Sequence, residues 1–189
     1  KQAKLFDYGQ RRNACPPSIT CYWKNMMDET FDLVIIGAGP AGMAGALEAA
    51  KHKLSVLVLD EQSEEGGQIY RAISTNERLR PETYALLGND YQCGKKLLLS
   101  FQQARVKYLS GAVVWQVEDD RSVHFLLNGQ AHQVEAKRLL IATGAQERPV
   151  PIPGWELPGV MGAAAADVLL KSSGMVPSGR VVLAGNGPL

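Results

Sequence analysis

The chain has 189 residues, of which 46% are hydrophobic and 21% are charged, and its formal net charge at pH 7 is +1. These values fit a globular protein with one domain, or one domain and part of another, and exclude a disordered chain. The near balance of 20 Lys and Arg against 19 Asp and Glu gives no electrostatic reason to expect nucleic acid or an anionic membrane surface as a partner.

The sequence also argues against a membrane span and against a secreted disulfide framework. Its longest apolar stretches, Leu33 to Ala50 and Gly159 to Leu170, are interrupted by Gly, Pro or an acidic residue, whereas a spanning helix needs roughly 20 clean residues. An odd number of cysteines without a CxxC pair or a four-ligand set fits a reducing compartment and indicates no metal site. These cysteines are Cys15, Cys21 and Cys93. We therefore predict a cytoplasmic protein without a membrane span.

Residues 1–27 precede the first recognisable element. From Lys1 to Asn25 the sequence has neither helical nor strand periodicity, and ACPPSITCYW lacks the uninterrupted apolar core of a secretory signal. We predict that this segment is a leader or upstream read-through and is disordered.

A buried strand, a glycine-rich turn and a helix follow in that order. Phe31 to Ile36 predicts a parallel strand, GAGPAG follows at once, and MAGALEAAKHK has helical composition to about Lys53. Glycines in this pattern allow a tight turn, close approach of the main chain to a diphosphate, and close packing of the helix on the strand. The phosphates would meet free N–H groups at the positive end of the helix dipole. The predicted contacts are Gly37, Gly39, Pro40, Ala41 and Gly42.

The next predicted strand, Leu54 to Leu59, ends in two acidic residues. Asp60 lies 23 positions after Gly37, close to the roughly 20 expected for a carboxylate that binds the ribose of a dinucleotide. Asp60 is the first choice for this role and Glu61 the second. A carboxylate here favours an unphosphorylated ribose, as in FAD or NAD, over NADP, but it does not separate FAD from NAD.

Short strands are predicted over residues 111–144. Turns are expected at Glu118 to Arg121 and at Asn128-Gly129, the latter a strong hairpin signal. The apolar run Leu139 to Ile141 predicts a buried strand that turns sharply at the sequence ATG.

Two further stretches resemble a known family. Together with the glycine turn, EEGGQIYR (Glu64 to Arg71) and RLLIATGAQERPVPIPG (Arg138 to Gly154) resemble the two-dinucleotide-domain flavoprotein reductases, which are similar to the pyridine nucleotide-disulfide oxidoreductases. The resemblance implies an α/β fold, with a Rossmann-like FAD-binding domain that has a parallel sheet, helices and an inserted antiparallel β-meander. It implies that the glycine turn holds FAD. The further FAD contacts that it implies are Gly66, Gly67, Gln68, Ala142, Thr143 and Gly144.

The C-terminal part resembles the beginning of the family's second dinucleotide-binding domain. A proline-rich connection leads to MGAAAADVLLKSSG, which predicts a helix, and RVVLAGNGPL resembles a strand and glycine turn that the family uses for NAD(P). Gly185 and Gly187 are the expected NAD(P) contacts. We predict an incomplete FAD-binding domain over 28–150 and, over 151–189, a linker and the start of a truncated NAD(P)-binding-type domain. On this division the chain is expected to be a fragment.

The absence of dithiol motifs restricts the resemblance to a smaller group within this family. Neither GGQIYRAISTNERL nor residues 146–184 contain a cysteine, so no thiol pair is expected beside a flavin. The combination DEQ, GGQIYR, IATGAQERPVPIPGW and LPGVMGAAAADVLLK resembles the FAD-containing alpha subunit of the opine oxidase, D-hydroxyproline dehydrogenase and hydrogen cyanide synthase group, over Phe31 to Leu189. This resemblance implies oxidation of an amine or amino acid, with electron transfer through flavin to a second flavoprotein subunit or another acceptor. It would place any iron-sulfur cluster only C-terminal to Leu189.

Two other classes stay open. One is an NAD(P)H-dependent flavoprotein reductase of the ferredoxin reductase or NADH oxidase type, without a dithiol. The other is a non-catalytic subunit that binds a nucleotide. No catalytic residue is assigned, because in a flavoprotein the isoalloxazine ring carries the redox chemistry.

Overall fold

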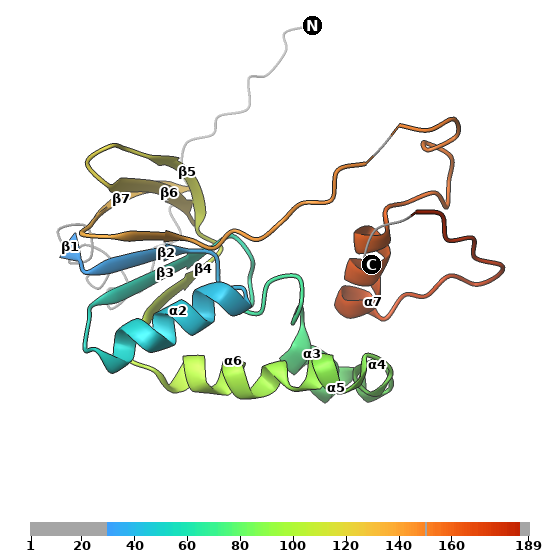
Figure 1. Ribbon diagram of the computed structural model, residues 1–189, viewed down its shortest axis with the longest axis horizontal. Coiled ribbons are helices and arrows are strands. Elements are labelled where there is room, and N and C mark those ends of the chain that lie inside the picture. The colour runs from blue at the N-terminus through green and yellow to red at the C-terminus, as the bar shows by residue number, and fades with distance from the viewer. Residues whose placement is uncertain (1–29, 150, 186–189) are drawn as a thin grey trace, which may run out of the picture.

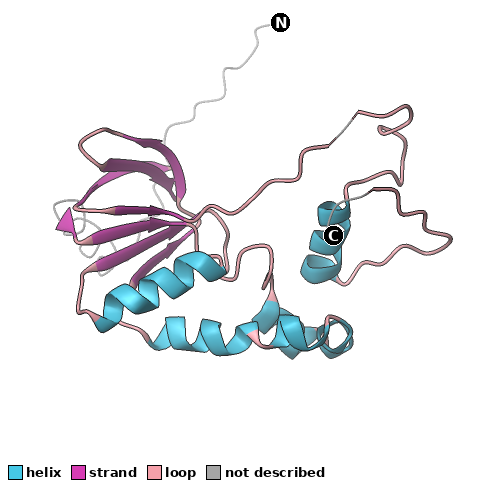
Figure 2. Cartoon of the chain, in the orientation of Figure 1, coloured by secondary structure: helices cyan, strands magenta, loops and turns pink. Residues whose placement is uncertain are grey.

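Two four-stranded sheets stack on one another, and helices cover the outer face of one of them (Figure 1; Figure 2 shows the same layers by type of secondary structure). The computed structural model describes residues 30–149 and 151–185. The expected leader, 1–27, lies outside the described residues, as do residues 28 and 29 of the expected FAD-binding domain. The predicted α/β fold, a Rossmann-like parallel sheet with an inserted antiparallel meander, is confirmed.

The parallel sheet has the strand order β4-β3-β2-β8. Its strands are β2 (Leu33–Ile36), β3 (Val56–Asp60), β4 (Lys107–Ser110) and β8 (Leu139–Ile141). All three pairings are parallel. Each central strand is an almost continuous apolar run because both faces of this sheet are covered. Since the strands all point the same way, their carboxyl ends and the loops that follow them meet at one edge, where open α/β sheets bind ligands.

The predicted single strand from Phe31 to Ile36 is wrong in one respect, because the chain bends at Asp32. Before the bend, β1 (Thr30–Phe31) pairs with the meander sheet. The N–H of Asp32 donates to the Ser55 hydroxyl (2.8 Å), and its carboxylate accepts from the Ser55 N–H (2.8 Å) and the Lys137 ammonium (2.8 Å). The Lys137 hydrogen bond, more than any other contact, lowers the pKa of Asp32 below its usual range. These side-chain bonds replace ladder hydrogen bonds and let the chain pass from one sheet to the other.

The second sheet is a meander with the strand order β1-β7-β6-β5. Its antiparallel strands are β5 (Val113–Val117), β6 (Ser122–Leu127) and β7 (Gln130–Ala136). Both predicted turns are present. The N–H of Arg121 donates to the Glu118 carbonyl (2.9 Å), and Asn128 and Gly129 both have positive φ angles, of 51° and 76°, as a tight hairpin turn of this type requires.

Helices cover the other face of the parallel sheet. The helix predicted after the glycine turn is α2 (Pro40–Lys51), and it lies beside α6 (Gly94–Gln103) (Figure 1). Three short helices connect β3 to α6, after a loop that spans residues 61–72. They are α3 (Ile73–Leu79), α4 (Pro81–Leu86) and α5 (Gly88–Gln92).

Alternate residues of the central strands fill two separate cores. Val34 and Leu57 face the meander, where they belong to the same cluster as Phe125, and Ile35 faces the helices, where it belongs to the same cluster as Met43. All five side chains are at most 1% exposed. Because successive side chains of a strand point to opposite faces, the parallel sheet packs against the meander on one face and against the helices on the other.

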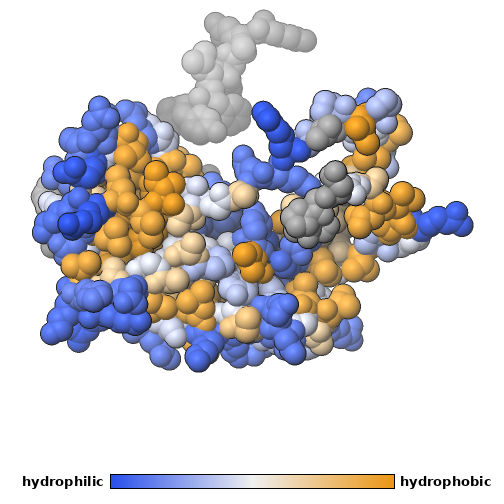
Figure 3. Space-filling view, in the orientation of Figure 1, coloured by the Kyte–Doolittle hydropathy of each residue, from blue (hydrophilic) through white to orange (hydrophobic). Residues whose placement is uncertain are grey.

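Beyond β8 the chain runs through an exposed linker to α7 (Ala163–Ser173), which confirms the predicted helix (Figure 1). The strand predicted within residues 180–184 is not found. Val182 and Leu183 are 83% and 81% exposed, and no described strand pairs with this segment. Hydrophobic residues gather over α7 and this segment in Figure 3.

None of the described helices combines the length and the apolar composition that crossing a bilayer requires.

Replacing Phe125 by Ala should destabilise the fold, because this side chain is 1% exposed and fills the space between the two sheets. Large core truncations of this kind cost about 3–5 kcal/mol. Leu126→Ala on the same strand is the matched control, since Leu126 is 42% exposed, and it should cost less than about 1 kcal/mol. Chemical denaturation of both variants measures the difference, and equal effects would contradict the packing described here.

Candidate dinucleotide-binding site

The turn between β2 and α2 has almost no side-chain bulk. Gly37 has a φ of +104°, and its N–H donates to the Leu59 carbonyl (2.7 Å). A Cβ on Gly37 would come within 2.9 Å of the carbonyl carbon of Ala142, and a Cβ on Gly42 would come within 3.0 Å of the carbonyl carbon of Gly37. The packing of the protein itself therefore requires both glycines.

Gly39 differs from these two glycines, because the packing of the protein does not require a glycine at this position. Its φ of −72° suits any residue, and a Cβ there would meet only the Gly67 Cα within 4 Å, at 3.9 Å. The N–H groups of Gly39, Ala41 and Gly42 have no hydrogen-bond partner among the described residues, and Pro40, which begins α2, has no N–H. The missing side chain thus leaves room beside unpaired donors at a positive helix end, the arrangement that binds a phosphate.

The loop after β3 lies against this turn. The N–H of Gly66 donates to the Ala38 carbonyl (2.9 Å), and a Cβ on Gly67 would come within 2.9 Å of the Gly39 Cα. Both loop glycines have positive φ angles, of 121° and 61°. The structure therefore brings the glycines of EEGGQIYR next to the first glycine motif, and at Gly67 only a residue without a side chain allows that approach.

Asp60 holds the turn from the end of β3. Its buried carboxylate accepts hydrogen bonds from the N–H groups of Ala38 and Gln62, the second at 2.7 Å. A carboxylate offers about four acceptor positions, so Asp60 can still accept from a ribose hydroxyl, while its neighbour Glu61 is exposed.

The Tyr108 hydroxyl is buried without a described partner. Burial, followed by the charge of Asp60, raises the pKa of Tyr108 above its usual value.

The sequence ATG directly follows β8 on the other side of the turn. The N–H of Ala142 donates to the Ile36 carbonyl (2.8 Å), which places the strand end beside Gly37. Thr143 and Gly144 follow as exposed residues at the same edge of the sheet.

Gln68, Gly185 and Gly187 complete the set of expected cofactor contacts. Gln68 is exposed and its side-chain oxygen accepts from Arg71 (3.1 Å). Gly185, an expected NAD(P) contact, is an exposed residue of the segment after α7, and Gly187 is outside the described residues.

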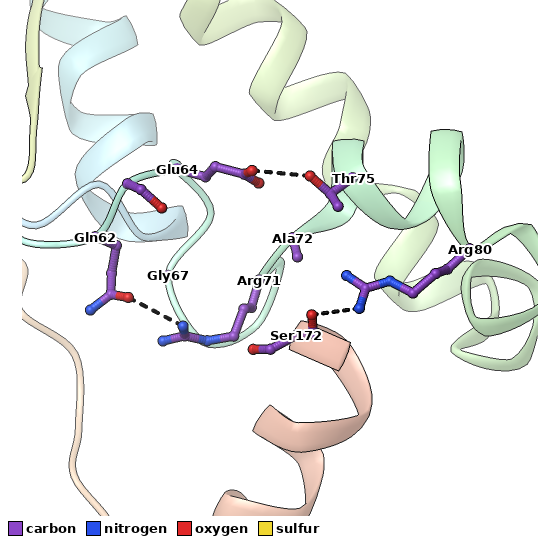
Figure 4. Close-up of a pocket in the computed structure, with 9 residues that line it drawn as sticks. Gln62, Glu64, Gly67, Arg71, Ala72, Thr75, Arg80 and Ser172 are labelled. Atoms are coloured by element: carbon purple, nitrogen blue, oxygen red, sulfur yellow. Dashed lines mark hydrogen bonds between the residues drawn. The ribbon is translucent and has the colours of Figure 1, made fainter. Parts of the chain in front are cut away.

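Sequence reasoning missed a pocket beside Gly67. Thr75, Arg80 and Ser172 line it together with the loop after β3 (Figure 4). No local pattern marks these residues, because the pocket depends on α7 reaching α3 from more than 90 positions along the chain.

Among residues 30–149 and 151–185 no cluster of three or more His, Cys, Asp or Glu side chains could hold a metal ion. Cys93 is an exposed free thiol that donates to the Asp90 carbonyl (3.0 Å).

The comparisons with known proteins agree with this geometry. The model of the pyridine nucleotide-disulphide oxidoreductase family matches residues 31–189, and the chain belongs to that family. It is 47% identical over 171 residues to an opine oxidase subunit of Agrobacterium tumefaciens, with 86% of this chain and 33% of that protein covered. It is 35% identical over 159 residues to the HcnB subunit of hydrogen cyanide synthase from Pseudomonas aeruginosa, with 82% and 33% covered.

These relatives support the resemblance to the opine oxidase and hydrogen cyanide synthase group. The chain spans about a third of their length. Among solved structures, L-proline dehydrogenase from P. horikoshii has a similar fold, with a TM-score of 0.61, 22% sequence identity, and coverage of 77% of this chain and 29% of that one.

Gly39→Ala and Gly37→Ala should separate binding from folding. Because the Gly39 site has room and an ordinary φ, Ala there should change the free energy of unfolding by less than about 1 kcal/mol while weakening FAD binding at least about tenfold. Gly37→Ala should instead lower stability, since a Cβ collides with main chain at a positive φ. Denaturant unfolding and flavin fluorescence titration measure the two effects. Unchanged FAD affinity in Gly39→Ala would refute the assignment of this turn.

Asp60→Asn should weaken both folding and FAD binding. The amide removes a charged acceptor from two main-chain N–H groups, a loss of about 1–3 kcal/mol, and removes a strong acceptor for the ribose. Glu61→Gln is the matched control and should leave both quantities near wild type, because Glu61 is exposed. If Glu61→Gln alone weakened FAD binding, the ribose contact would belong to Glu61.

Proposed function

We propose that this chain is the FAD-binding part of an oxidoreductase subunit that takes part in the oxidation of an amine or amino acid. The observation that carries the proposal is the opening at Gly39, which protein packing leaves free beside unpaired N–H groups. Membership of the pyridine nucleotide-disulphide oxidoreductase family supports a dinucleotide as the occupant.

In this proposal the chain supplies position and hydrogen bonds, and FAD, when bound, supplies the redox chemistry. The N–H groups of Gly39, Ala41 and Gly42 bind the diphosphate, and the Asp60 carboxylate binds the ribose of the adenosine. The main chain of the neighbouring loops lies along the rest of the cofactor. These loop residues are Gly66, Gly67, Gln68, Ala142, Thr143 and Gly144.

The relatives support the proposed substrate class and the proposed partner. The opine oxidase and hydrogen cyanide synthase relatives both carry names that make each of them one subunit of a larger enzyme. We infer that this protein likewise works with a second flavoprotein subunit, which receives or delivers electrons through the flavin. The use of cysteine, with Cys93 as a free thiol, favours the cytoplasm as its location.

We also infer two domains within residues 28–189, a FAD-binding domain to about residue 150 and, after a linker, the start of an NAD(P)-binding-type domain. The high exposure of Val182 and Leu183 supports this division, because an apolar segment of this kind is suited to a buried strand of a further sheet.

Anaerobic visible spectra of the purified protein, with any subunit that co-purifies, test the function. Bleaching of the flavin band by an amino acid or opine, only when the partner subunit is present, is the expected result. Bleaching by NADH alone would instead assign an NAD(P)H-dependent reductase. A colourless protein that binds ADP but not FAD would assign a nucleotide-binding subunit without redox activity.

A further inference from the structure

The helix α7 is held in place mainly by polar contacts at its C-terminal end. Every residue of α7 is at least partly exposed, and the described residues of the linker that joins it to β8 are mostly exposed as well. Because α7 buries little apolar surface, the hydrophobic effect contributes little to its position. Its position therefore depends on a small number of hydrogen bonds.

Two of these hydrogen bonds end on main-chain carbonyls of α7. The Asn76 Nδ2 donates to the Lys171 carbonyl (2.8 Å), and the Arg80 Nη1 donates to the Ser172 carbonyl (2.5 Å; Figure 4). The last carbonyls of a helix have no partner within the helix, so these donors satisfy acceptors that α7 itself cannot. Asn76 is 0% exposed, so the core of the protein fixes the position of one donor.

The side chain of Lys171 contacts the loop GGQIYR, residues 66–71, which we call the cofactor loop. Its Nζ donates to the Gln68 carbonyl (3.3 Å) and lies 5.9 Å from the centre of the Tyr91 ring. This side chain is 12% exposed, and its ammonium group also pairs with Asp167 of the same helix (2.7 Å). The end of α7 is thus bonded directly to the middle of the cofactor loop.

A second connection runs through two buried side chains. The Tyr91 hydroxyl accepts from the Asn76 Nδ2 (2.8 Å) and donates to the Arg71 carbonyl at the end of the cofactor loop (2.7 Å). The same Asn76 amide therefore binds α7 with one hydrogen and, through Tyr91, supports the cofactor loop with the other. Movement of this loop would disturb both connections to α7.

The cofactor loop also lies against the glycine turn, since the Gly66 N–H donates to the Ala38 carbonyl (2.9 Å). In the proposed function this loop lies along FAD, and the present inference rests on that assignment. A ligand that holds the loop in one conformation also holds the carbonyls that Lys171 and Tyr91 bind. Coupling of this kind is reciprocal, so docked α7 raises FAD affinity by the factor by which FAD favours docking.

We propose that α7 docks reversibly on the cofactor loop and that FAD binding stabilises the docked state. Asn76 and Lys171 are the positioning residues that couple the two events. Because α7 precedes the proposed second domain, loading of FAD fixes the position at which the chain enters that domain.

Hydrogen–deuterium exchange of the full chain, measured by mass spectrometry with and without saturating FAD, tests this coupling. An isolated helix of 11 residues is marginal in water, so undocking should expose the amides of α7 to exchange. These amides should exchange at least about fivefold more slowly with FAD, the lower end of typical coupling between sites. The hairpin β6–β7 belongs to the other sheet and is the internal reference, whose exchange should change less than about twofold.

Lys171→Met removes the bond to Gln68 and keeps most of the apolar length of the side chain. It should speed the exchange of α7 in FAD-free protein, reduce the FAD-induced slowing to less than about twofold, and weaken FAD binding about fivefold. Lys96→Met is the matched control, because Lys96 is an exposed lysine of α6, and it should behave as wild type. Asn76→Ala should act like Lys171→Met. Since Asn76 is buried, Lys171→Met is decisive if Asn76→Ala does not fold.

The coupling is overturned if FAD slows exchange in the cofactor loop but not in α7, or if it slows the reference hairpin as much as α7. Wild-type slowing of α7 in Lys171→Met would also overturn it. FAD binding without protection of α7 refutes the coupling alone, whereas a protein that binds no FAD refutes the proposed function and the coupling together. Flavin fluorescence titration of the same samples separates these two results.

Discussion

The carboxylate of Asp60 joins the end of β3 to the glycine turn 22 positions earlier, through the main-chain N–H of Ala38. Its other oxygen accepts from the N–H of Gln62 and so directs the loop that follows. A buried carboxylate is stable only when hydrogen bonds compensate its charge, and the end of a parallel strand beside a turn supplies such donors. Because this loop returns to the turn through Gly66, one acidic side chain organises both glycine segments of the candidate site.

The glycines of the turn therefore serve different purposes, although the motif presents them as one pattern. Gly37 and Gly42 are needed so that β2, β8 and α2 can pack, and they would be needed with or without a ligand. Gly39 contributes nothing to that packing and has an ordinary φ. A position where the fold tolerates a side chain but the sequence has none is stronger evidence for a ligand than a glycine that the fold requires.

The pocket beside Gly67 depends on contacts between segments that are far apart in the sequence. Asn76 and Arg80 donate to the Lys171 and Ser172 carbonyls and hold the end of α7 against α3. The same contacts close one side of the pocket that contains Arg71, so the lining of that pocket comes from three segments: the loop after β3, α3 with Arg80 at its end, and the end of α7. Family membership and the geometry of the glycine turn both support a cofactor site. The pocket beside Gly67, in contrast, forms only because α7 packs against α3.

Local sequence determined β2, β3 and β8 of the parallel sheet, α2, the hairpin turns and the glycine motif, because each depends on interactions within a few residues or on the period of apolar side chains. The fourth parallel strand, β4, and the helices α3 to α6 were not predicted. It did not reveal the bend at Asp32, which depends on Ser55 and Lys137, and it predicted a strand within residues 180–184 that has no described neighbour to pair with. The sequence predicted a ribose contact at Asp60 but did not reveal the two main-chain N–H groups that its carboxylate binds. Only the tertiary structure decided which glycine is free for a ligand and which arginines face a common pocket, because both depend on how residues far apart in the chain approach one another in space.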